Sequence, residues 1–470
     1  MYGLQNYSLF NWGIIIMVLL KISLAKKFMF LLILCLLLGI TPQVFAEQKD
    51  PNEQTQLSEP LRREATDYNE SSSTSKTEKA PTNWMERLFK PIIKYSPVDV
   101  EVPYTILPDS LQSWKDFKKQ MEEKYGTSIS IILDDHHQQV LSGPGADEGR
   151  NLFWWNVTVK QRLWKGGRII TKARGSNTDG NPPNGITPLV GSKLNIDWAA
   201  YETEMLYLAN LYLEQKLFND KFLIAIGKLT FPEYFDENKV AGTWDFFSHS
   251  LVKNQAFPHR YHTVGALGRY DVTDRLYVQA GITDAKGIRS ETGVNTAFDD
   301  DAEFLFMGEF GIKTKNSKGL EGNYRFDLWY DPQPLKRHDG NGSEEDTIGC
   351  GVSFDQALTE KLGGFFRYGW DDGRVRKFSN YWSIGGTYKA PIPQREKDVL
   401  GFGVGQGITH QQYRRANNAT DTETIFEVYY KIFITEWCSL TLDIQTLLNP
   451  GTKASNDTAV IPGFRIKMLF

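Results

Sequence analysis

Residues 438–470 read CSLTLDIQTLLNPGTKASNDTAVIPGFRIKMLF. Over 440–448 the even positions are mostly apolar, while the odd positions include the polar side chains Asp443 and Gln445. An alternation with period two is typical of a β-strand that has one apolar and one polar face. The alternation returns after a polar loop and ends on Phe470. We expect this last strand to close a membrane barrel, with its final aromatic side chain at the lipid–water interface.

The composition limits the class of membrane protein that the chain can form. A hydrophobic fraction of 41% and a mean hydropathy of -0.40 exclude a polytopic helical membrane protein, because each spanning helix needs about 20 consecutive apolar residues. The formal net charge is -4. Without a basic surplus, we expect no nucleic-acid partner. A chain of 470 residues is long enough for one large barrel or for several soluble domains.

The amino-terminal residues have the pattern of a secretory signal peptide. Two lysines precede the apolar run 28–40, and a small-residue cleavage site ending at Ala46 follows. We therefore expect residues 1–46 to be removed on export. A second apolar run lies upstream, at 14–20. An over-long start, with initiation nearer Met17, explains this run, and an uncleaved anchor is the alternative.

Two segments precede the strand pattern. Residues 47–108 are rich in Glu, Gln, Ser, Thr, Lys and Pro. Such a composition buries too little apolar surface to offset chain entropy, so we expect a disordered periplasmic tether. Residues 109–126 carry apolar side chains at helical spacing and end in a glycine, which predicts an amphipathic helix. We expect this helix to pack at the periplasmic mouth of a barrel, and a plug or a partner-binding helix is the alternative.

From residue 127 onward the pattern is that of strands. About sixteen segments alternate apolar and polar side chains, an even number that is typical of single-chain bacterial barrels. The predicted strands begin near residues 127, 152, 167, 201, 221, 263, 275, 303, 322, 346, 360, 380, 398, 421, 438 and 460. Their connections alternate between short turns and long loops, as periplasmic turns and outer loops do. The sequence therefore predicts an all-β, antiparallel, up-and-down transmembrane β-barrel over residues 127–470.

The two faces of the predicted strands indicate a water-filled interior. One face carries Arg, Lys, Glu and Asp on strand after strand, and the other carries Phe, Tyr, Trp, Leu and Val. Charged groups line an interior only where that interior is wet, and about sixteen strands enclose an aqueous channel rather than a packed core. We therefore expect Phe326 and Val428 to face lipid, and Arg325 and Glu427 to face the lumen.

Three segments resemble the carbohydrate-selective porins of the OprB type. They are YFDENKVAGTWDFFSHSLVKNQAF at 234–257, the ending LTLDIQTLLNPG with AVIPGFRIKMLF, and WKDFKKQMEEKYGTSISIILD at 114–134. The resemblance covers residues 109–470 and departs from the family at Pro462, which interrupts the last strand, and in the length of the tether. It implies a sixteen-stranded barrel through which sugars diffuse across the outer membrane of a Gram-negative-type bacterium.

The lumen-facing positions bear on what passes through the channel. A sugar offers hydroxyls on its rim and C–H groups on its faces, so its recognition needs aromatic faces together with hydrogen-bonding partners. The polar faces mix both signs of charge, which favours a neutral polyol over phosphate. The basic members are Lys160, Arg162, Arg168 and Arg174, the acidic members are Glu202, Glu204, Asp327 and Glu427, and Trp154 and Trp329 lie among them.

The connection at 230–262 is the longest, and its aromatic side chains are too many for a freely solvated loop. We expect it to fold into the lumen and form the constriction. The alternative is that its aromatics pack the loop on the wall and contact no solute. The candidate substrate-binding and constriction residues in the loop are Asp236, Asn238, Trp244, Asp245 and Phe247. The candidates on the wall are Arg162, Arg325, Asp327 and Trp329, and for the last three a ladder of wall ion pairs is the alternative.

Other types of site are less well supported by the sequence. His136-His137 and His259-x-x-His262 do not belong to a Cys or carboxylate ligand set with the spacing of a defined metal site. The glycine-rich run 401–407 has the period of a strand rather than of a nucleotide loop. We expect a passive porin without cofactor, a monomer or homotrimer, with sugars, outer-membrane lipid and lipopolysaccharide as partners. The alternatives are a channel for anions or other small solutes, if Arg and Lys alone ring the constriction, and an outer-membrane barrel enzyme.

Overall fold

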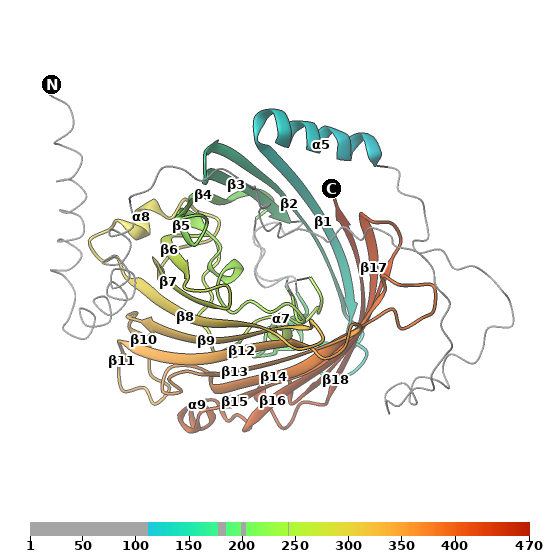
Figure 1. Ribbon diagram of the computed structural model, residues 1–470. Coiled ribbons are helices and arrows are strands. Elements are labelled where there is room, and N and C mark those ends of the chain that lie inside the picture. The colour runs from blue at the N-terminus through green and yellow to red at the C-terminus, as the bar shows by residue number, and fades with distance from the viewer. Residues whose placement is uncertain (1–110, 177–184, 199–203, 243) are drawn as a thin grey trace, which may run out of the picture. The chain divides into compact units, whose positions relative to one another are not determined.

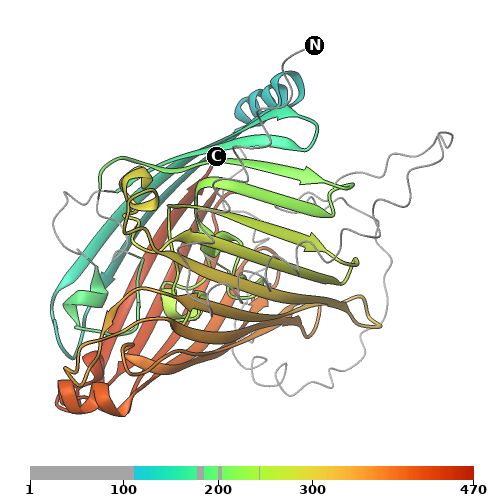
Figure 2. The same cartoon turned by 90° about the vertical axis from the view of Figure 1, so that its left-hand side faces the viewer.

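The computed structural model describes residues 111–176, 185–198, 204–242 and 244–470. Sixteen antiparallel strands follow one another around a closed wall in chain order (Figure 1). Strand β1 (Thr127–Gln139) pairs with β18 (Ala459–Leu469) and closes the barrel. Figure 2 shows neighbouring strands running side by side along the wall. The expected signal peptide and tether, residues 1–46 and 47–108, lie outside the described residues.

Each predicted strand corresponds to one strand of the barrel. The strands between β1 and β18 are β2 (Gly149–Trp164), β3 (Gly167–Ser176), β4 (Tyr207–Leu217), β5 (Phe222–Leu229), β6 (Thr263–Asp271), β7 (Leu276–Asp284), β8 (Phe304–Lys315), β9 (Glu321–Asp331), β12 (Thr347–Ala357), β13 (Leu362–Trp370), β14 (Phe378–Lys389), β15 (Val399–Thr409), β16 (Thr422–Phe433) and β17 (Cys438–Leu448). The prediction of a sixteen-stranded antiparallel barrel is therefore confirmed. The largest difference is at β4, which begins at Tyr207 rather than near residue 201.

Short strands and helices lie in the connections between the barrel strands. Strands β10 (Leu335–Lys336) and β11 (Ser343–Glu344) form a separate two-stranded sheet. The short helices are α6 (Ile186–Leu189), η2 (Phe231–Glu233), α7 (His249–Val252), α8 (Val294–Ala297), α9 (Gln411–Asn417) and η3 (Pro450–Thr452). Among the described residues, none of the helices has the length and apolar character needed to cross a bilayer.

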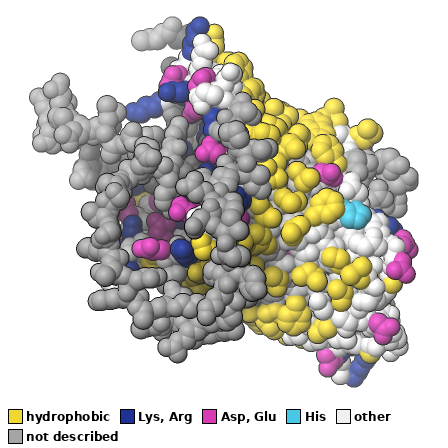
Figure 3. Space-filling model, turned by 90° about the vertical axis from the view of Figure 1, so that its right-hand side faces the viewer, with side chains coloured by type: hydrophobic (Ala, Val, Ile, Leu, Met, Phe, Trp, Pro, Cys, Tyr) yellow, Lys and Arg dark blue, Asp and Glu magenta, His cyan; other side chains and the backbone are white. Residues whose placement is uncertain are grey.

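The wall is apolar on its outer surface and polar on its inner surface, as expected. Phe326 and Val428 are 42% and 46% exposed. Arg325 and Glu427, which precede them on the same strands, are only 6% and 1% exposed. Figure 3 shows hydrophobic side chains gathered over the outer wall. Such a surface suits contact with lipid, and the closed ladder leaves no strand edge unpaired in the membrane.

We expect Phe326→Arg to destabilise the barrel. Phe326 stands at the middle of β9, and its ladder partners Phe310 and Val352 lie on the same outer face. A charged side chain at the bilayer midplane costs about 2–4 kcal/mol on the lipid face of a barrel. Urea unfolding in lipid vesicles measures this free energy, with Phe326→Leu as the control. An equal loss in both variants would contradict the lipid-facing position of Phe326.

Helix α5 (Gln112–Tyr125) lies beside β1. It ends at Gly126, whose φ of 68° is left-handed and whose N–H donates to the carbonyl oxygen of Glu122. Glycine adopts this conformation without steric cost. Lys115 Nζ forms an ion pair of 2.8 Å with Glu436, in the short turn between β16 and β17. Because short turns face the periplasm in such barrels, we assign α5 to the periplasmic end.

Candidate functional site in the barrel lumen

The loop 230–262, between β5 and β6, crosses the interior of the barrel. The N–H of Asp236 donates to Glu309 on β8 at 3.2 Å, and the N–H of Phe247 donates to Glu427 on β16 at 2.6 Å. Strands β8 and β16 stand in different parts of the closed wall. Figure 1 shows helix α7, which belongs to this loop, inside the ring of strands. A loop that contacts both parts of the inner wall occupies the lumen.

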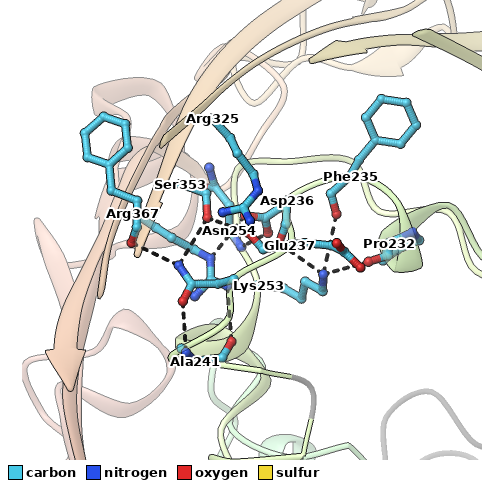
Figure 4. A network of polar contacts seen from close by, with 12 residues as sticks. Pro232, Phe235, Asp236, Glu237, Ala241, Lys253, Asn254, Arg325, Ser353 and Arg367 are labelled. Carbon is cyan, nitrogen blue, oxygen red and sulfur yellow. Dashed lines mark hydrogen bonds and ion pairs between the residues drawn. The ribbon is translucent and has the colours of Figure 1, made fainter. Parts of the chain in front are cut away.

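Arg367 on β13 holds three points of this loop against the wall (Figure 4). Its Nε donates to Asp236 Oδ1 at 3.1 Å, its Nη1 to the carbonyl oxygen of Leu251 at 2.8 Å, and its Nη2 to that of Ala241 at 3.3 Å. The Arg367 side chain is fully buried. The planar guanidinium fixes the directions of these donors, so one side chain sets the position of three separate loop residues.

The loop is also cross-linked to itself and to the wall. Asp236 accepts a hydrogen bond from the N–H of Asn254 at 2.6 Å, and Lys253 Nζ donates to the carbonyl oxygen of Pro232 at 2.7 Å. Burial lowers the pKa of Lys253, while the Asp236 carboxylate acts in the opposite direction. Asn254 Nδ2 donates to the carbonyl oxygen of Tyr368 on β13 at 3.0 Å. These contacts pair the buried charges and amides of the loop.

The loop histidines serve as hydrogen-bonding groups. His249 Nε2 lies 2.6 Å from the Tyr261 hydroxyl, and His259 Nε2 lies 3.0 Å from the carbonyl oxygen of Asn254. Burial lowers the pKa of His249 and of His259 well below the ordinary value, so both are neutral at neutral pH. Within the described residues, no group of three His, Cys, Asp or Glu side chains is arranged to hold a metal ion.

Glycines on the inner face of the wall make room for the loop. A Cβ on Gly405 of β15 would lie 3.2 Å from Leu251 Cδ2, and a Cβ on Gly369 of β13 would lie 2.4 Å from Asn254 Oδ1. The glycine-rich run 401–407 forms part of β15, as its period of two indicates. The missing side chains bring the loop backbone close to the strands, as glycine in a strand commonly does.

Most of the nine candidate residues are covered by the loop or belong to its anchors. Six are between 0% and 8% exposed, namely Asp236, Asn238, Phe247, Arg325, Asp327 and Trp329. Arg325 forms an ion pair of 2.7 Å with Asp355 on the adjacent strand. Asp327 stands opposite Glu309 in the β8–β9 ladder, and Glu309 accepts hydrogen bonds from the Tyr277 hydroxyl at 2.7 Å and from Gln279 Nε2 at 3.0 Å. In this conformation, these groups contact the protein and position the loop and the wall.

Trp244 and Asp245 lie at a more open place in the lumen. The Trp244 ring stacks on Trp154 of β2, with ring centroids 5.0 Å apart and an interplanar angle of 20°. Lys467 Nζ lies 4.2 Å from the centroid of the Trp244 ring. Asp245, whose side chain is 25% exposed, forms an ion pair of 3.0 Å with Lys431. Aromatic faces and charged groups are thus brought together at the surface of the loop.

Three residues of this arrangement were not among the predicted site residues. Trp198 stacks on Trp244 with a centroid distance of 6.3 Å, and Lys431 and Lys467 contact the loop from β16 and β18. The alternation of side chains along β16 and β18 places both lysines on polar faces, so the sequence could have predicted them. No pattern in the sequence predicts the role of Trp198. We call Trp154, Trp198 and Trp244 the tryptophan platform. The remaining predicted residue, Arg162, is exposed near the turn that ends β2.

Comparison with known proteins places the barrel in a family. The model of the carbohydrate-selective porin, OprB family, matches residues 169–470. This chain belongs to the OprB family. Porin AaxA of Chlamydia felis is 23% identical over 389 residues, which cover 81% of this chain and 80% of that protein. Porin B of Pseudomonas aeruginosa is 22% identical over 316 residues, which cover 56% and 68% of the two chains.

The fold comparison agrees with this assignment. The high-pH structure of Pseudomonas putida OprB matches with a TM-score of 0.66 at 17% identity, over 76% of this chain and 97% of that one. The resemblance to the OprB type that the sequence indicated is therefore confirmed. As an OprB-family barrel with an apolar outer wall, the protein is a channel of the Gram-negative outer membrane.

Proposed function

We propose that this OprB-family channel is a passive porin for carbohydrates and that the loop 230–262 forms its constriction. The tryptophan platform is the observation that carries the proposal. Trp154 is only 2% exposed and lies behind the Trp244 ring, so the half-buried rings of Trp244 and Trp198 are those that offer apolar faces to the C–H faces of a sugar. Lys467 and Asp245 at the edge of the platform offer a donor and an acceptor to the hydroxyls. Trp244 belongs to the loop and Trp154 to the wall, so the platform joins the two.

Passage through such a constriction requires weak binding that is easily released. A sugar exchanges part of its hydration for the aromatic face and for the charged groups beside it, and then moves on, because conduction fails where a solute binds too tightly. The proposal involves no catalysis and no cofactor. We propose that the protein is a monomer or a homotrimer. The apolar outer wall contacts lipid in a monomer, and part of it contacts the neighbouring copies in a homotrimer.

Proteoliposomes test the proposed function directly. The protein is reconstituted, and vesicle swelling is followed in glucose, in a disaccharide and in a chloride salt. Swelling in the sugars supports a carbohydrate porin. Swelling in the salt without swelling in either sugar would overturn the proposal in favour of an ion channel.

We expect Trp244→Ala to weaken the interaction of sugars with the channel. Loss of one aromatic contact of about 0.5–1.5 kcal/mol corresponds to roughly 2- to 10-fold weaker binding. Sugar-dependent block of the ion current in planar bilayers measures this affinity. Trp437→Ala is the matched control, because Trp437 stacks on Phe470 at a centroid distance of 5.5 Å in a turn outside the loop. Equal sugar block in the two variants would contradict the role of the platform.

A further inference from the structure

The barrel wall is short at the neighbouring strands β5, β6 and β7. Strand β5 has 8 residues, and β6 and β7 have 9 each. At about 3.3 Å per residue and a tilt of about 45°, β5 rises only about 19 Å, whereas the apolar band of an outer-membrane barrel is about 25 Å tall. Phe218 is exposed in the periplasmic turn before β5, where an aromatic girdle marks the edge of the band. The missing height therefore lies at the outer end of β5.

The connection between β7 and β8, residues 285–302, covers the outer face of this short wall. We call it the side loop. Lys228 on β5 stands opposite Leu211 of β4, which is exposed on the outer face. Lys228 shares this face but is only 5% exposed, because its Nζ donates to the carbonyl oxygens of Arg289, at 2.9 Å, and of Glu291. The side loop thus passes over a part of the wall that would otherwise contact lipid.

Two further contacts hold the side loop in this place. A Cβ on Gly293, which precedes helix α8, would lie 3.1 Å from Val264 Cγ2, and Val264 stands opposite Lys228 on the outer face. The hydroxyl of Thr296 in α8 donates to the carboxylate of Asp284 at the end of β7. Figure 1 shows α8 outside the ring of strands, beside β5 and β6. The side loop therefore belongs to the outer surface of the barrel.

The side loop presents apolar side chains outward. Ile288, Val294 and Phe298 are exposed. Phe298, at 77%, is more exposed than any other large hydrophobic side chain that the structure describes. Val294 and Phe298 are four residues apart and share one face of the helical turn, whereas Ala297 between them is buried. These side chains continue the lipid-facing surface of β5, on which Ile226 is exposed.

The charged groups of the side loop have both signs. Lys286 is exposed and pairs with an acidic neighbour, and Arg289 turns its guanidinium back toward an aromatic ring at the rim of the lumen. Glu291 and the three aspartates at 299–301 are exposed. No basic surplus selects an anionic head group, so the apolar side chains decide what this surface contacts. The aspartates follow Phe298 directly and limit it to a depth at which they stay in water.

We propose that the side loop inserts Ile288, Val294 and Phe298 into the acyl-chain boundary of the outer leaflet. It completes the lipid-facing surface that β5 is too short to provide, and the surface is continuous with the apolar wall below it. Burial of apolar side chains favours the insertion. Lipid offers no donor to a loop backbone, and Lys228 supplies donors to two of its carbonyl oxygens. The inference does not depend on the solute that the channel passes.

Quenching by labelled lipid tests the contact. The environment-sensitive fluorophore NBD is attached to Phe298→Cys in a chain whose other cysteines are replaced by serine. The protein is placed in phosphatidylcholine vesicles with a nitroxide on the acyl chains, because a zwitterionic lipid does not repel the aspartates. Asn341→Cys, at an exposed position between β10 and β11, is the matched control. We expect several-fold stronger quenching and a blue-shifted emission at position 298.

Two outcomes overturn the inference. Equal quenching at positions 298 and 341 would mean that the side loop stays in water. A blue-shifted label at position 298 that escapes the lipid nitroxide, and quenches itself between labelled copies, would assign the surface to a second copy of the chain.

Lys228→Met tests the anchor of the side loop. Methionine suits the lipid-facing side of β5 but donates no hydrogen bond, so we expect the side loop to leave the wall and quenching at position 298 to fall several-fold. Lys221→Met, at an exposed position in the turn before β5, is the control and is expected to leave quenching unchanged. Equal quenching in the two variants overturns the role of Lys228. The label at position 298 with Lys228 intact tests the lipid contact even if Lys228→Met does not fold.

Discussion

Arg367→Ala is expected to raise the single-channel conductance several-fold and to destabilise the protein. The substitution removes the donors that hold Asp236, Ala241 and Leu251. It also leaves the Asp236 carboxylate buried without its guanidinium partner, and breaking a buried ion pair in this way typically costs about 3–5 kcal/mol. Without these contacts, the loop 230–262 is held less tightly against the wall, and its displacement from the wall widens the path for ions. Planar-bilayer conductance and urea unfolding in vesicles measure the two effects.

Arg269→Ala is the matched control for this experiment. Arg269 also faces the lumen and pairs with a carboxylate, Asp271, at 3.1 Å, but this pair lies within β6. Its loss is expected to change conductance little. Removing both charges with Arg367→Ala and Asp236→Ala is expected to cost less stability than the two single losses added together, because the variants share one interaction. A channel with Arg367→Ala and unchanged conductance would show that other contacts position the loop.

The barrel was predictable because its signals are local. Period-two alternation in β17, and in the run 401–407, is a direct consequence of strand geometry. The order of short turns and long loops follows from the two compartments that an outer-membrane barrel faces. At β4 the strand starts later than expected, and a bulge shifts its pairing with β3 between Lys172 and Ala173. A bulge moves side chains between faces, which strict alternation does not foresee.

The candidate site was less predictable because its contacts are distant in sequence. Strand parity indicates that Arg325 and Asp327 face the lumen, but it does not indicate whether a loop covers them. The Arg367 to Asp236 contact joins residues 131 positions apart. Trp198 reaches the platform from the connection between β3 and β4. Which lumen charges stay accessible thus depends on how the loop folds, and that is set by tertiary contacts rather than by the pattern of any one strand.

The close fit between loop and wall leads to a second large expected effect, that of Gly369→Leu. A Cβ at this position would lie 2.4 Å from Asn254 Oδ1 and 2.8 Å from Ala256 Cβ. A leucine adds three further carbons, and overpacking a tight site is destabilising by about 1–3 kcal/mol or more. The least costly relief is displacement of the loop from β13. We therefore expect higher conductance together with weaker sugar block.

Gly308→Leu separates this effect from a general intolerance of the strands to leucine. Gly308 lies on the outer face of β8, where an added Cβ meets no atom within 4 Å. Leucine there faces lipid and restricts the unfolded chain more than glycine does, so stability is expected to hold or to rise by about 0.4–1 kcal/mol. Conductance and sugar block, measured in the same planar bilayers, are expected to match those of the unmodified channel. If Gly369→Leu behaved like Gly308→Leu, Gly369 would have no part in positioning the loop against β13, and the charged anchors alone would have to hold the loop in place.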